Sequence, residues 1–422
     1  APALGAVAVG STPTSLPHPA SLSHAARART RRSAKVSGQK SQGGRRSSSK
    51  SCRCCSCRTS AMQHVLLPAL LSFPSLRRNS SSCAKRSLFN PVFSLPGRVR
   101  DPAVRLNEAG EAELFFTHFR GNPAAMFTSA GAKDYYVSRV VTRDWQTFSE
   151  PSDITPPGFA SPDAPIRWDN ATIIAFQAYP DKSLGGKSSG LFFSRRDDGS
   201  EIWSEPRPFL REALTLPWNT GGRAIDPTLV LDSEGRLHCF FVGSTKRQRG
   251  DRRRANLLGQ AVSTDPDLQR WEVLSREAPL IGTSSRAPDG VENVAVFRRR
   301  SDAVMIYSEG LKSQHLAHAV SKDDLISWQR RGALSVGEAR WTAGRYGAPF
   351  VWAEGDCWWM ALMGEAETQT HQSAIGLLHS SDGVHWQLLP EAAGVEMGLP
   401  LRRSGVARRG GDGADGEREA EG

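Results

Sequence analysis

The sequence predicts an all-β protein, a five-bladed β-propeller, because two series of residues each recur five times. The first series is a tryptophan that closes a Ser- and Asp-rich turn at intervals of 57 to 68 residues: Trp145, Trp203, Trp271, Trp328 and Trp386. The second is a short head that begins each unit: Asp101-Pro, Asp163-Ala-Pro, Asp226-Pro, Glu292-Asn and Gly347-Ala-Pro. Five similar units predict five blades.

A run rich in aromatic and branched residues follows each head after a turn, which is typical of a β-strand. These runs are residues 113–118, 171–176, 237–242, 303–307 and 357–362. The first strand of each propeller blade lines the central channel, so we expect the heads to converge on one axial site. We expect each tryptophan to pack between neighbouring blades.

Charge is distributed unevenly along the 422 residues. Residues 1–100 contain 17 Lys or Arg and no Asp or Glu, whereas residues 101–422 contain the other 37 basic residues and all 43 acidic ones. The net charge of +11 therefore belongs to the first part, and the repeats are mildly acidic. A basic groove for nucleic acid is not expected on such a fold.

The composition divides the chain into three parts. Residues 1–90 form a basic, Ser/Arg-rich leader without apolar periodicity, expected to be disordered, and residues 401–422 form a short tail of the same kind. Residues 91–400 hold the propeller. The leader is typical of an organellar transit peptide, while the apolar run that begins at Met62 favours a secretory signal, so localisation stays open between the two. No apolar run reaches the ~20 residues of a membrane span.

Five of the seven cysteines lie in the leader, at Cys52, Cys54, Cys55, Cys57 and Cys83. They have no histidine partners at zinc-finger spacing, so no metal site is expected there. Cys239 and Cys357 occupy similar predicted strands of different blades, and we expect both to be buried thiols.

Carboxylates at the heads are the candidate catalytic residues: Asp101, Asp226 and Glu292. Hydrolysis of a glycosidic bond needs a carboxylic acid that protonates the leaving oxygen and a carboxylate that activates water or attacks the sugar. A third acidic group can tune the pKa of the acid. A single Asp-Pro is more often a turn device, but three carboxylates at the heads of separate units favour chemistry. For Asp163, a contact to a substrate hydroxyl and a plain turn stay equally open.

The pattern resembles the five-bladed β-propeller glycoside hydrolases, the superfamily of arabinanases, β-xylosidases, invertases and levansucrases, and it is most similar to family 43. The motifs are Asp101-Pro102, Asp226-Pro227 followed by Asp232-Ser-Glu-Gly235, and Glu292 before an apolar strand. The resemblance implies that Asp101 is the general base, Asp226 the pKa modulator and Glu292 the general acid of an inverting hydrolase.

Two departures from the family pattern matter. Residues 342–350 contain no histidine where many family members place one near a central metal or water; we therefore expect no cofactor and regard a central calcium as doubtful. Ile225 and Asn293 stand where the fructan-cleaving relatives have Arg and Cys, which disfavours a retaining, fructosidase-like reaction.

Candidate substrate-binding residues surround the heads. Arginines suit an acidic sugar but equally serve to compensate the head carboxylates. The tryptophans are more often packing residues than platforms for a sugar. The candidates are Arg100, His118, Asp163, Trp168, Arg223, Trp341, Arg345 and Tyr346.

Three other functions stay open at this point. Tyr346 beside Arg345 keeps a sialidase-like reaction in view, although sialidases have six blades. Phosphorolysis would need more basic residues near the acid than Arg223 and Arg345 supply. If the protein is a non-catalytic carbohydrate-binding propeller, the order of the acidic residues has no functional meaning. For an enzyme the expected partner is an oligo- or polysaccharide substrate. The protein is expected to be a monomer.

Overall fold

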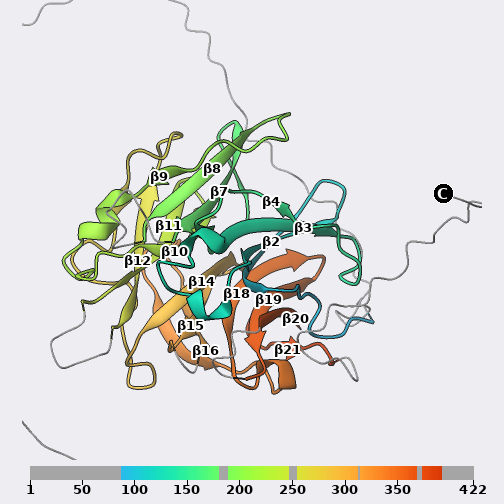
Figure 1. Ribbon diagram of the computed structural model, residues 1–422. Helices are drawn as coiled ribbons and strands as arrows, with labels where there is room; N and C mark the ends of the chain where they lie inside the picture. The colour runs from blue at the N-terminus through green and yellow to red at the C-terminus, as the bar shows by residue number, and fades with distance from the viewer. Residues whose placement is uncertain (1–86, 180–188, 247–253, 312–313, 368–372, 392–422) are drawn as a thin grey trace, which may run out of the picture. The chain divides into compact units, whose positions relative to one another are not determined.

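The structure is a computed structural model and describes residues 87–179, 189–246, 254–311, 314–367 and 373–391 (Figure 1). Residues 1–86 of the predicted leader and the whole predicted tail lie outside the described residues. Within the described part of the chain, no helix is long and apolar enough to cross a membrane. The described elements are β-strands and a few short 3-10 helices.

Five antiparallel sheets confirm the predicted five-bladed propeller. In four of them the strand order follows the chain without crossovers. The first blade consists of β1 (Arg98–Leu106), β2 (Ala112–Phe119), β3 (Tyr135–Thr142) and β4 (Ser152–Asp153). The third consists of β10 (Ile225–Leu231), β11 (Leu237–Ser244), β12 (Asn256–Ser263) and β13 (Glu272–Val273). Each second strand coincides with a predicted aromatic-rich run.

The last two blades repeat this order. The fourth blade consists of β14 (Val291–Arg298), β15 (Ala303–Glu309), β16 (His315–Ser321) and β17 (Gln329–Leu334). The fifth consists of β18 (Arg345–Glu354), β19 (Cys357–Glu365), β20 (Ser373–Ser380) and β21 (Gln387–Leu388). Strands of the first and last blades lie side by side, since β1 contacts β18, β19 and β20 (Figure 1).

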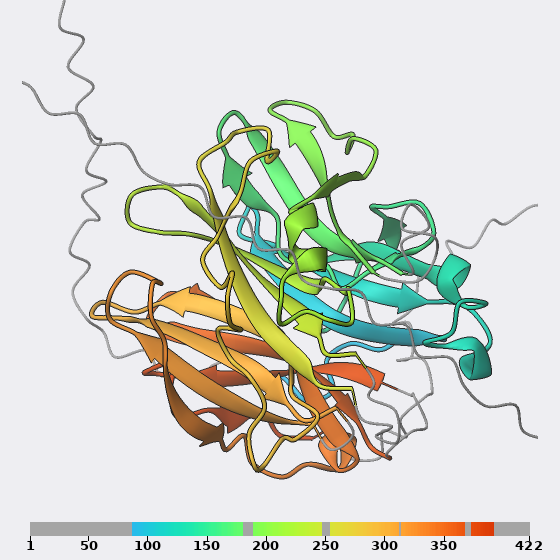
Figure 2. The same cartoon turned by 90° about the vertical axis from the view of Figure 1, so that its left-hand side faces the viewer.

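The innermost strand of the second blade is interrupted. Both β5 (Phe159–Ala160) and β6 (Ile166–Trp168) pair with β7 (Ala171–Ala178), and the sheet continues through β8 (Leu191–Asp197) and β9 (Arg207–Phe209). Short 3-10 helices occupy connections: η1 (Pro123–Ala125) and η2 (Ala132–Asp134) between β2 and β3, η4 (Arg211–Thr215) after β9 and η5 (Arg340–Thr342) before β18 (Figure 2).

The repeated tryptophans pack against the preceding blade, as the sequence predicts. Trp145 of the first blade stacks on Trp352 of the fifth, with ring centroids 5.5 Å apart. The other ring pairs follow the same rule: Trp271 with Phe209, Trp328 with Phe240 and Trp386 with Phe297. Trp203 packs on the cluster that holds Ala103 and Phe115 of the first blade. These contacts bury one sheet face of each blade on its neighbour.

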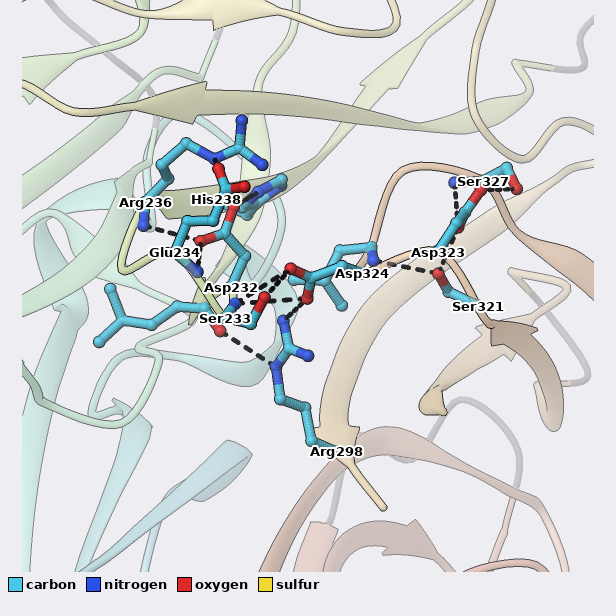
Figure 3. A network of polar contacts seen from close by, with 12 residues as sticks. Asp232, Ser233, Glu234, Arg236, His238, Arg298, Ser321, Asp323, Asp324 and Ser327 are labelled. Carbon is cyan, nitrogen blue, oxygen red and sulfur yellow. Dashed lines mark hydrogen bonds and ion pairs between the residues drawn. The ribbon is translucent and has the colours of Figure 1, made fainter. Parts of the chain in front are cut away.

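In the Ser/Asp turns before the tryptophans, the Asp side chain accepts hydrogen bonds from other groups of the same turn. Asp323 accepts hydrogen bonds from the Ser327 amide and from Ser321, both at 2.9 Å. Its neighbour Asp324 instead reaches the third blade, where it accepts from the amide of Ser233 at 3.1 Å, and it also pairs with Arg298 of its own blade (Figure 3). The turn chemistry therefore also joins adjacent blades.

A buried polar chain extends that junction inward. The side chain of Asp232 is fully buried beside the ring of His238, which lies 3.1 Å away (Figure 3). Gln260 reaches both the other nitrogen of this ring, at 2.9 Å, and the carbonyl oxygen of Leu325 in the fourth blade, at 2.8 Å. Among the described residues the Gln260 Oε1 atom has no hydrogen-bond partner, but the bonds that the Gln260 side-chain amide does make favour one arrangement of the two blades.

The segment before the first strand fastens the first blade to the last. The amide of Asn90 donates to the carbonyl oxygen of Leu377 at 2.9 Å, and its oxygen accepts from the Leu377 N–H at 2.7 Å. Phe93 pairs with Ile375 as an isolated antiparallel bridge. Leu88, Val92 and Phe93 are buried in the same cluster as the strands of both blades.

Of the two cysteines among the described residues, Cys239 is a free and buried thiol, whereas Cys357 is disulfide-bonded. The expectation of two thiols is therefore wrong for Cys357.

Replacing Asn90 by Ala is expected to destabilise the propeller by about 2–3 kcal/mol, because it leaves the buried N–H and C=O of Leu377 without their side-chain partner. Urea unfolding of the variant and the wild type measures this difference. Gln146→Ala, at an exposed position, is the control and should change stability by no more than about 0.5 kcal/mol. Equal midpoints for Asn90→Ala and Gln146→Ala would show that the segment does not close the ring.

Candidate active site

A backbone irregularity recurs on the innermost strand of every blade. The register shifts between Arg100 and Ala103, Ile225 and Thr228, Glu292 and Val294, and Gly347 and Phe350, and the second blade is broken between β5 and β6. At each of these points a non-glycine residue adopts a positive φ between 42° and 50°: Asp101, Ser161, Asp226, Asn293 and Ala348. Left-handed backbone at such residues is strained and concentrates at functional sites.

These five equivalent positions correct the predicted heads of three blades. In the second blade the equivalent residue is Ser161 rather than Asp163, in the fourth it is Asn293 rather than Glu292, and in the fifth it is Ala348 rather than Gly347. Glu292 precedes the bulge by one residue. Asp101 and Asp226 therefore occupy the same place in their blades, while Glu292 reaches the axis from the next position.

The three candidate carboxylates line one cavity of about 460 Å³, a size typical of ligand sites. Its wall combines acidic, cationic, hydroxyl and aromatic side chains from the first four blades. The lining includes Arg100, Asp101, Thr117, Phe127, Tyr135, Ser161, Gln177, Tyr179, Arg223, Asp226, Arg254, Glu292 and Asn293. The convergence that the head series predicts is thus present in the structure.

Asp101 is held by hydrogen-bond donors from three blades. The Thr117 hydroxyl donates to Oδ2 at 2.8 Å, the Ser161 hydroxyl to the same oxygen at 3.2 Å, and the Asn293 amide lies 3.5 Å from Oδ1. The backbone amide of Ser161 in turn donates to the Thr117 hydroxyl at 2.7 Å. These contacts fix the direction in which the Asp101 carboxylate faces the cavity.

Glu292 lies between two amide donors from neighbouring strands. The Asn256 side chain donates to Oε1, and the Gln314 side chain donates to Oε2 at 3.1 Å. Asp226 is tied through its backbone, since its N–H donates to Oε1 of Gln177 at 2.9 Å. Glu292 is thereby positioned by side chains of its own blade and of the third blade.

Burial changes the proton affinity of this group. Burial, followed by the charges of Glu292 and Asp101, raises the pKa of Asp226 to about 8. Burial also raises the pKa of Glu292, against the opposing effect of nearby arginines. Like charges at close range disfavour double ionisation. The Asp226–Glu292 pair therefore retains a proton near neutral pH.

The predicted arginines have different surroundings. Arg345 is engaged in an ion pair, because its guanidinium makes two hydrogen bonds to the Glu365 carboxylate, at 2.7 and 2.9 Å. Arg100 lies 3.5 Å from the same carboxylate and covers the ring of Phe127 at 5.1 Å. Arg223 lines the cavity and acts on Asp226 and Glu292. Of the three, Arg345 is outside the cavity lining.

His118 and Asp163 do not line this cavity. The His118 ring packs beside Phe116, and one of its nitrogens accepts from Arg120 at 3.2 Å; burial lowers its pKa to about 4. Asp163 is buried below the bulges, where it accepts the amide of Leu229 at 2.6 Å. That bond links the second and third blades.

Trp168 and Trp341 belong to hydrophobic clusters of the second and fifth blades. Trp341 is 1% exposed and fills the space above Gly364 and Gly376, where an added Cβ would lie 2.3 to 2.4 Å from its ring. Tyr346 packs against the same fifth-blade cluster. The packing alternative describes both tryptophans, and no sugar contact is open to Trp341.

Several residues of the site escaped the sequence reasoning. Ser161, Asn256, Gln314 and Tyr179 come from strand ends and second or third strands, and Glu365 ends the second strand of the fifth blade. Only Ser161 carried a signal, because Ser161-Pro162 matches the Asp-Pro heads in form. The others repeat in no other blade.

Within the described ranges, no group of three or more His, Cys, Asp or Glu side chains is arranged to hold a metal ion. A small cavity of about 30 Å³ lies along the ring of bulges and is lined by Asp101, Ser161, Asp226, Asn293 and Ala348. It has room for about one water molecule. The expectation of no cofactor stays a prediction.

No protein-family model matches the sequence. No curated protein matches it either. Solved structures share the fold. A thermostable family-43 glycoside hydrolase is 14% identical over 74% of this chain and 97% of its own, with a TM-score of 0.52.

Two further structures give similar values. The α-L-arabinofuranosidase from Lactobacillus brevis is 13% identical over 72% of this chain and 98% of its own, with a TM-score of 0.51. The GH43_1 enzyme from Xanthomonas citri complexed with xylotriose is 14% identical over 72% and 94%, with a TM-score of 0.51. The chain thus has the five-bladed fold of these family-43 structures.

Asp226→Asn is expected to gain stability relative to the wild type as the pH rises. The folded-state pKa of Asp226, about 8, exceeds the ordinary value near 4, so its contribution to stability is present below pH ~4 and is lost as the pH rises to about 8. An asparagine does not titrate. Urea unfolding at pH 5 and pH 9 should therefore show the stability of the variant rising relative to the wild type by at least ~1 kcal/mol between the two pH values.

Asp144→Asn is the matched control, in which the change in stability relative to the wild type is expected to have the opposite sign. Hydrogen bonds led by that from the Thr147 N–H lower the pKa of Asp144, despite some desolvation, so its ionised form stabilises the fold above pH ~4. This variant should lose stability at both pH values. A loss of stability in Asp226→Asn at pH 9 would contradict a buried, proton-retaining Asp226.

Proposed function

We propose that this protein is a glycoside hydrolase that cleaves an O-glycosidic bond by acid and base catalysis between two carboxyl groups. The observation that carries the proposal is the convergence of Asp101, Asp226 and Glu292, from three blades, on one cavity in which the last two retain a proton. A glycosidase needs one protonated and one ionised carboxyl group on opposite sides of the scissile bond.

In the proposed reaction Glu292 is the general acid. Its protonated carboxyl group donates a proton to the leaving glycosidic oxygen as the bond to the anomeric carbon breaks. The Asn256 and Gln314 amides that hold both of its oxygens keep the carboxyl group in one orientation. Orientation of this kind determines how much of the proton transfer occurs in the transition state.

Asp101 is the proposed general base. It takes a proton from the attacking water, and the hydroxyls of Thr117 and Ser161 and the amide of Asn293 hold its carboxylate in place. Asp226 is the proposed modulator of the acid. The carboxyl groups of Asp226 and Glu292 share one proton, and when Glu292 carries it, the negative charge on Asp226 opposes its loss. The Ser161 hydroxyl acts on both Asp226 and Asp101. After each cycle the proton on Asp101 must return to Glu292 through solvent.

Aromatic side chains on the cavity wall support a sugar as the substrate. The ring of Phe127 is 48% exposed at the wall, and the rings of Tyr135 and Tyr179 lie 4.5 Å apart beside it. Apolar faces of sugar rings pack on aromatic rings of this kind, while the surrounding hydroxyl and amide groups bind sugar hydroxyls. The shared fold with xylosidase- and arabinofuranosidase-type structures agrees with this choice.

Two alternatives from other classes carry less support. A sialidase-like reaction would use Tyr346, but this residue packs in the fifth-blade cluster outside the cavity. A binding propeller without catalysis gives no reason for two buried carboxyl groups whose pKa values are raised in the ligand cavity.

Glu292→Gln is expected to lower turnover by about 10²- to 10⁴-fold on glycosides with poor leaving groups, because such groups cannot leave unprotonated. With a dinitrophenyl glycoside, which leaves without a proton, the loss should be far smaller. A screen of aryl glycosides and polysaccharides first finds the substrate. Glu272→Gln, at the exposed position of strand β13, is the control. Equal losses on both kinds of leaving group would remove Glu292 as the acid.

Inversion is expected at the anomeric carbon, because the order base, modulator and acid is that of the inverting relatives, and a water must fit between Asp101 and Glu292. Proton NMR recorded within the first minutes of hydrolysis identifies the anomer released before mutarotation. Release of the anomer with the substrate's own configuration would instead assign a nucleophilic role to Asp101.

A further inference from the structure

Arg223 lines the cavity without a direct partner. Its half-buried guanidinium makes no side-chain hydrogen bond or ion pair to any of the residues that the structure describes, although its charge acts on Asp226, Glu292 and Tyr179. Asn219 bonds only the backbone N–H and C=O of Arg223, so the loop is fixed and the side chain is left to face the cavity. A half-buried guanidinium without a partner is unusual.

Arg100 supplies a second cationic group on the same wall. It is 8% exposed, and the only carboxylate bonded to it among the described residues is Glu365, at the long distance of 3.5 Å. The oxygens of Glu365 are already taken by two shorter bonds from Arg345. Two guanidinium groups thus share one carboxylate, which leaves a positive charge beside the cavity.

The two arginines act on the same region. Both Arg100 and Arg223 oppose the pKa rise of Glu292, and both oppose that of the Tyr179 hydroxyl. Asp226 and Glu292 together retain a proton near neutral pH, so the three lining acids supply two negative charges opposite the two arginines. The charges balance in number, but among the described residues no carboxylate bonds Arg223, so its N–H donors face the cavity without a partner.

We propose that Arg100 and Arg223 form a subsite for an oxyanion, next to the carboxyl groups that cleave the glycosidic bond. The oxyanion is either a carboxylate carried by the sugar, as in a uronic acid, or free inorganic phosphate. Guanidinium groups bind both through paired N–H donors. The identification of a sugar acid as the substrate rests on the proposed function, whereas the binding of an anion to the two arginines does not.

The first experiment measures binding to the whole protein by calorimetry, with glucuronic and galacturonic acid, glucose and galactose, and inorganic phosphate as separate probes. An acid should bind roughly ten- to hundredfold more tightly than the matching neutral sugar, the usual worth of a charge-assisted pair. The subsite is assigned to free phosphate if phosphate binds without displacing a uronic acid and the uronic acids bind no more tightly than the neutral sugars. Failure of every anion to bind more tightly than glucose overturns the proposal.

The second experiment compares kcat/KM for aryl glycosides that differ only at C6, glucoside with glucuronide and galactoside with galacturonide, in both anomeric forms. Arg223→Met should lower the acid-to-neutral ratio by roughly ten- to hundredfold, and Arg223→Lys by less, because a lysine keeps the charge but not the paired donors. Arg143→Met, at an 83% exposed side chain, is the matched control and should leave the ratio unchanged. An unchanged ratio in a folded Arg223→Met would overturn a sugar carboxylate as the ligand.

The phosphate source has its own readout. If phosphate attacks the anomeric carbon in place of water, the aglycone leaves with a proton and the product is a sugar 1-phosphate, visible by phosphorus NMR. Failure of the proposed function can be told apart from failure of the subsite. If an anion binds in an Arg223-dependent way but no glycoside is cleaved, only the proposed hydrolase function is overturned. If only neutral glycosides are cleaved and phosphate has no role, only the proposed subsite is overturned.

Discussion

Each blade of this propeller can bury one face of its sheet only against the next blade, and the rest of the structure depends on that constraint. A four-stranded sheet alone leaves its apolar face in water. The repeated tryptophans cover this face from the following blade, from Trp271 on Phe209 to Trp145 on Trp352 across the closure. Because the ring must also close, the segment around Asn90 joins the last blade to the first.

Closure determines where the chemistry lies. Five inner strands meet at one axis, and a bulge in each gives a strained residue there a left-handed backbone. Strain of this kind persists only where surrounding structure holds it in place. In two blades the strained residue is Asp101 or Asp226, and in the others it is Ser161, Asn293 or Ala348. The same backbone geometry therefore presents a different side chain from each blade, and this produces an asymmetric site inside a pseudo-symmetric fold.

Burial affects the charge at the axis as much as ion pairing does. Because burial and mutual repulsion disfavour two negative charges on Asp226 and Glu292, the two carboxyl groups together retain a proton. The arginines limit this effect without bonding either carboxyl group. Such a site works against stability, because burying groups that would ionise in water costs free energy. The inter-blade contacts at the tryptophans and at Asp324 stabilise the scaffold that carries it.

The sequence by itself determined the number of blades, their second strands, the role of the tryptophans and the convergence of Asp101, Asp226 and Glu292, because each of these features repeats with the period of the fold. Only the tertiary structure decided which residues surround the carboxyl groups. Gln314, Asn256 and Tyr179 do not recur in the head series, and the bulges, which change by one residue which side chains of a strand face the axis, decide which neighbour points there. Trp341 is close to a head in sequence but lies in the core, because its ring in η5 fills the space above Gly364 and Gly376.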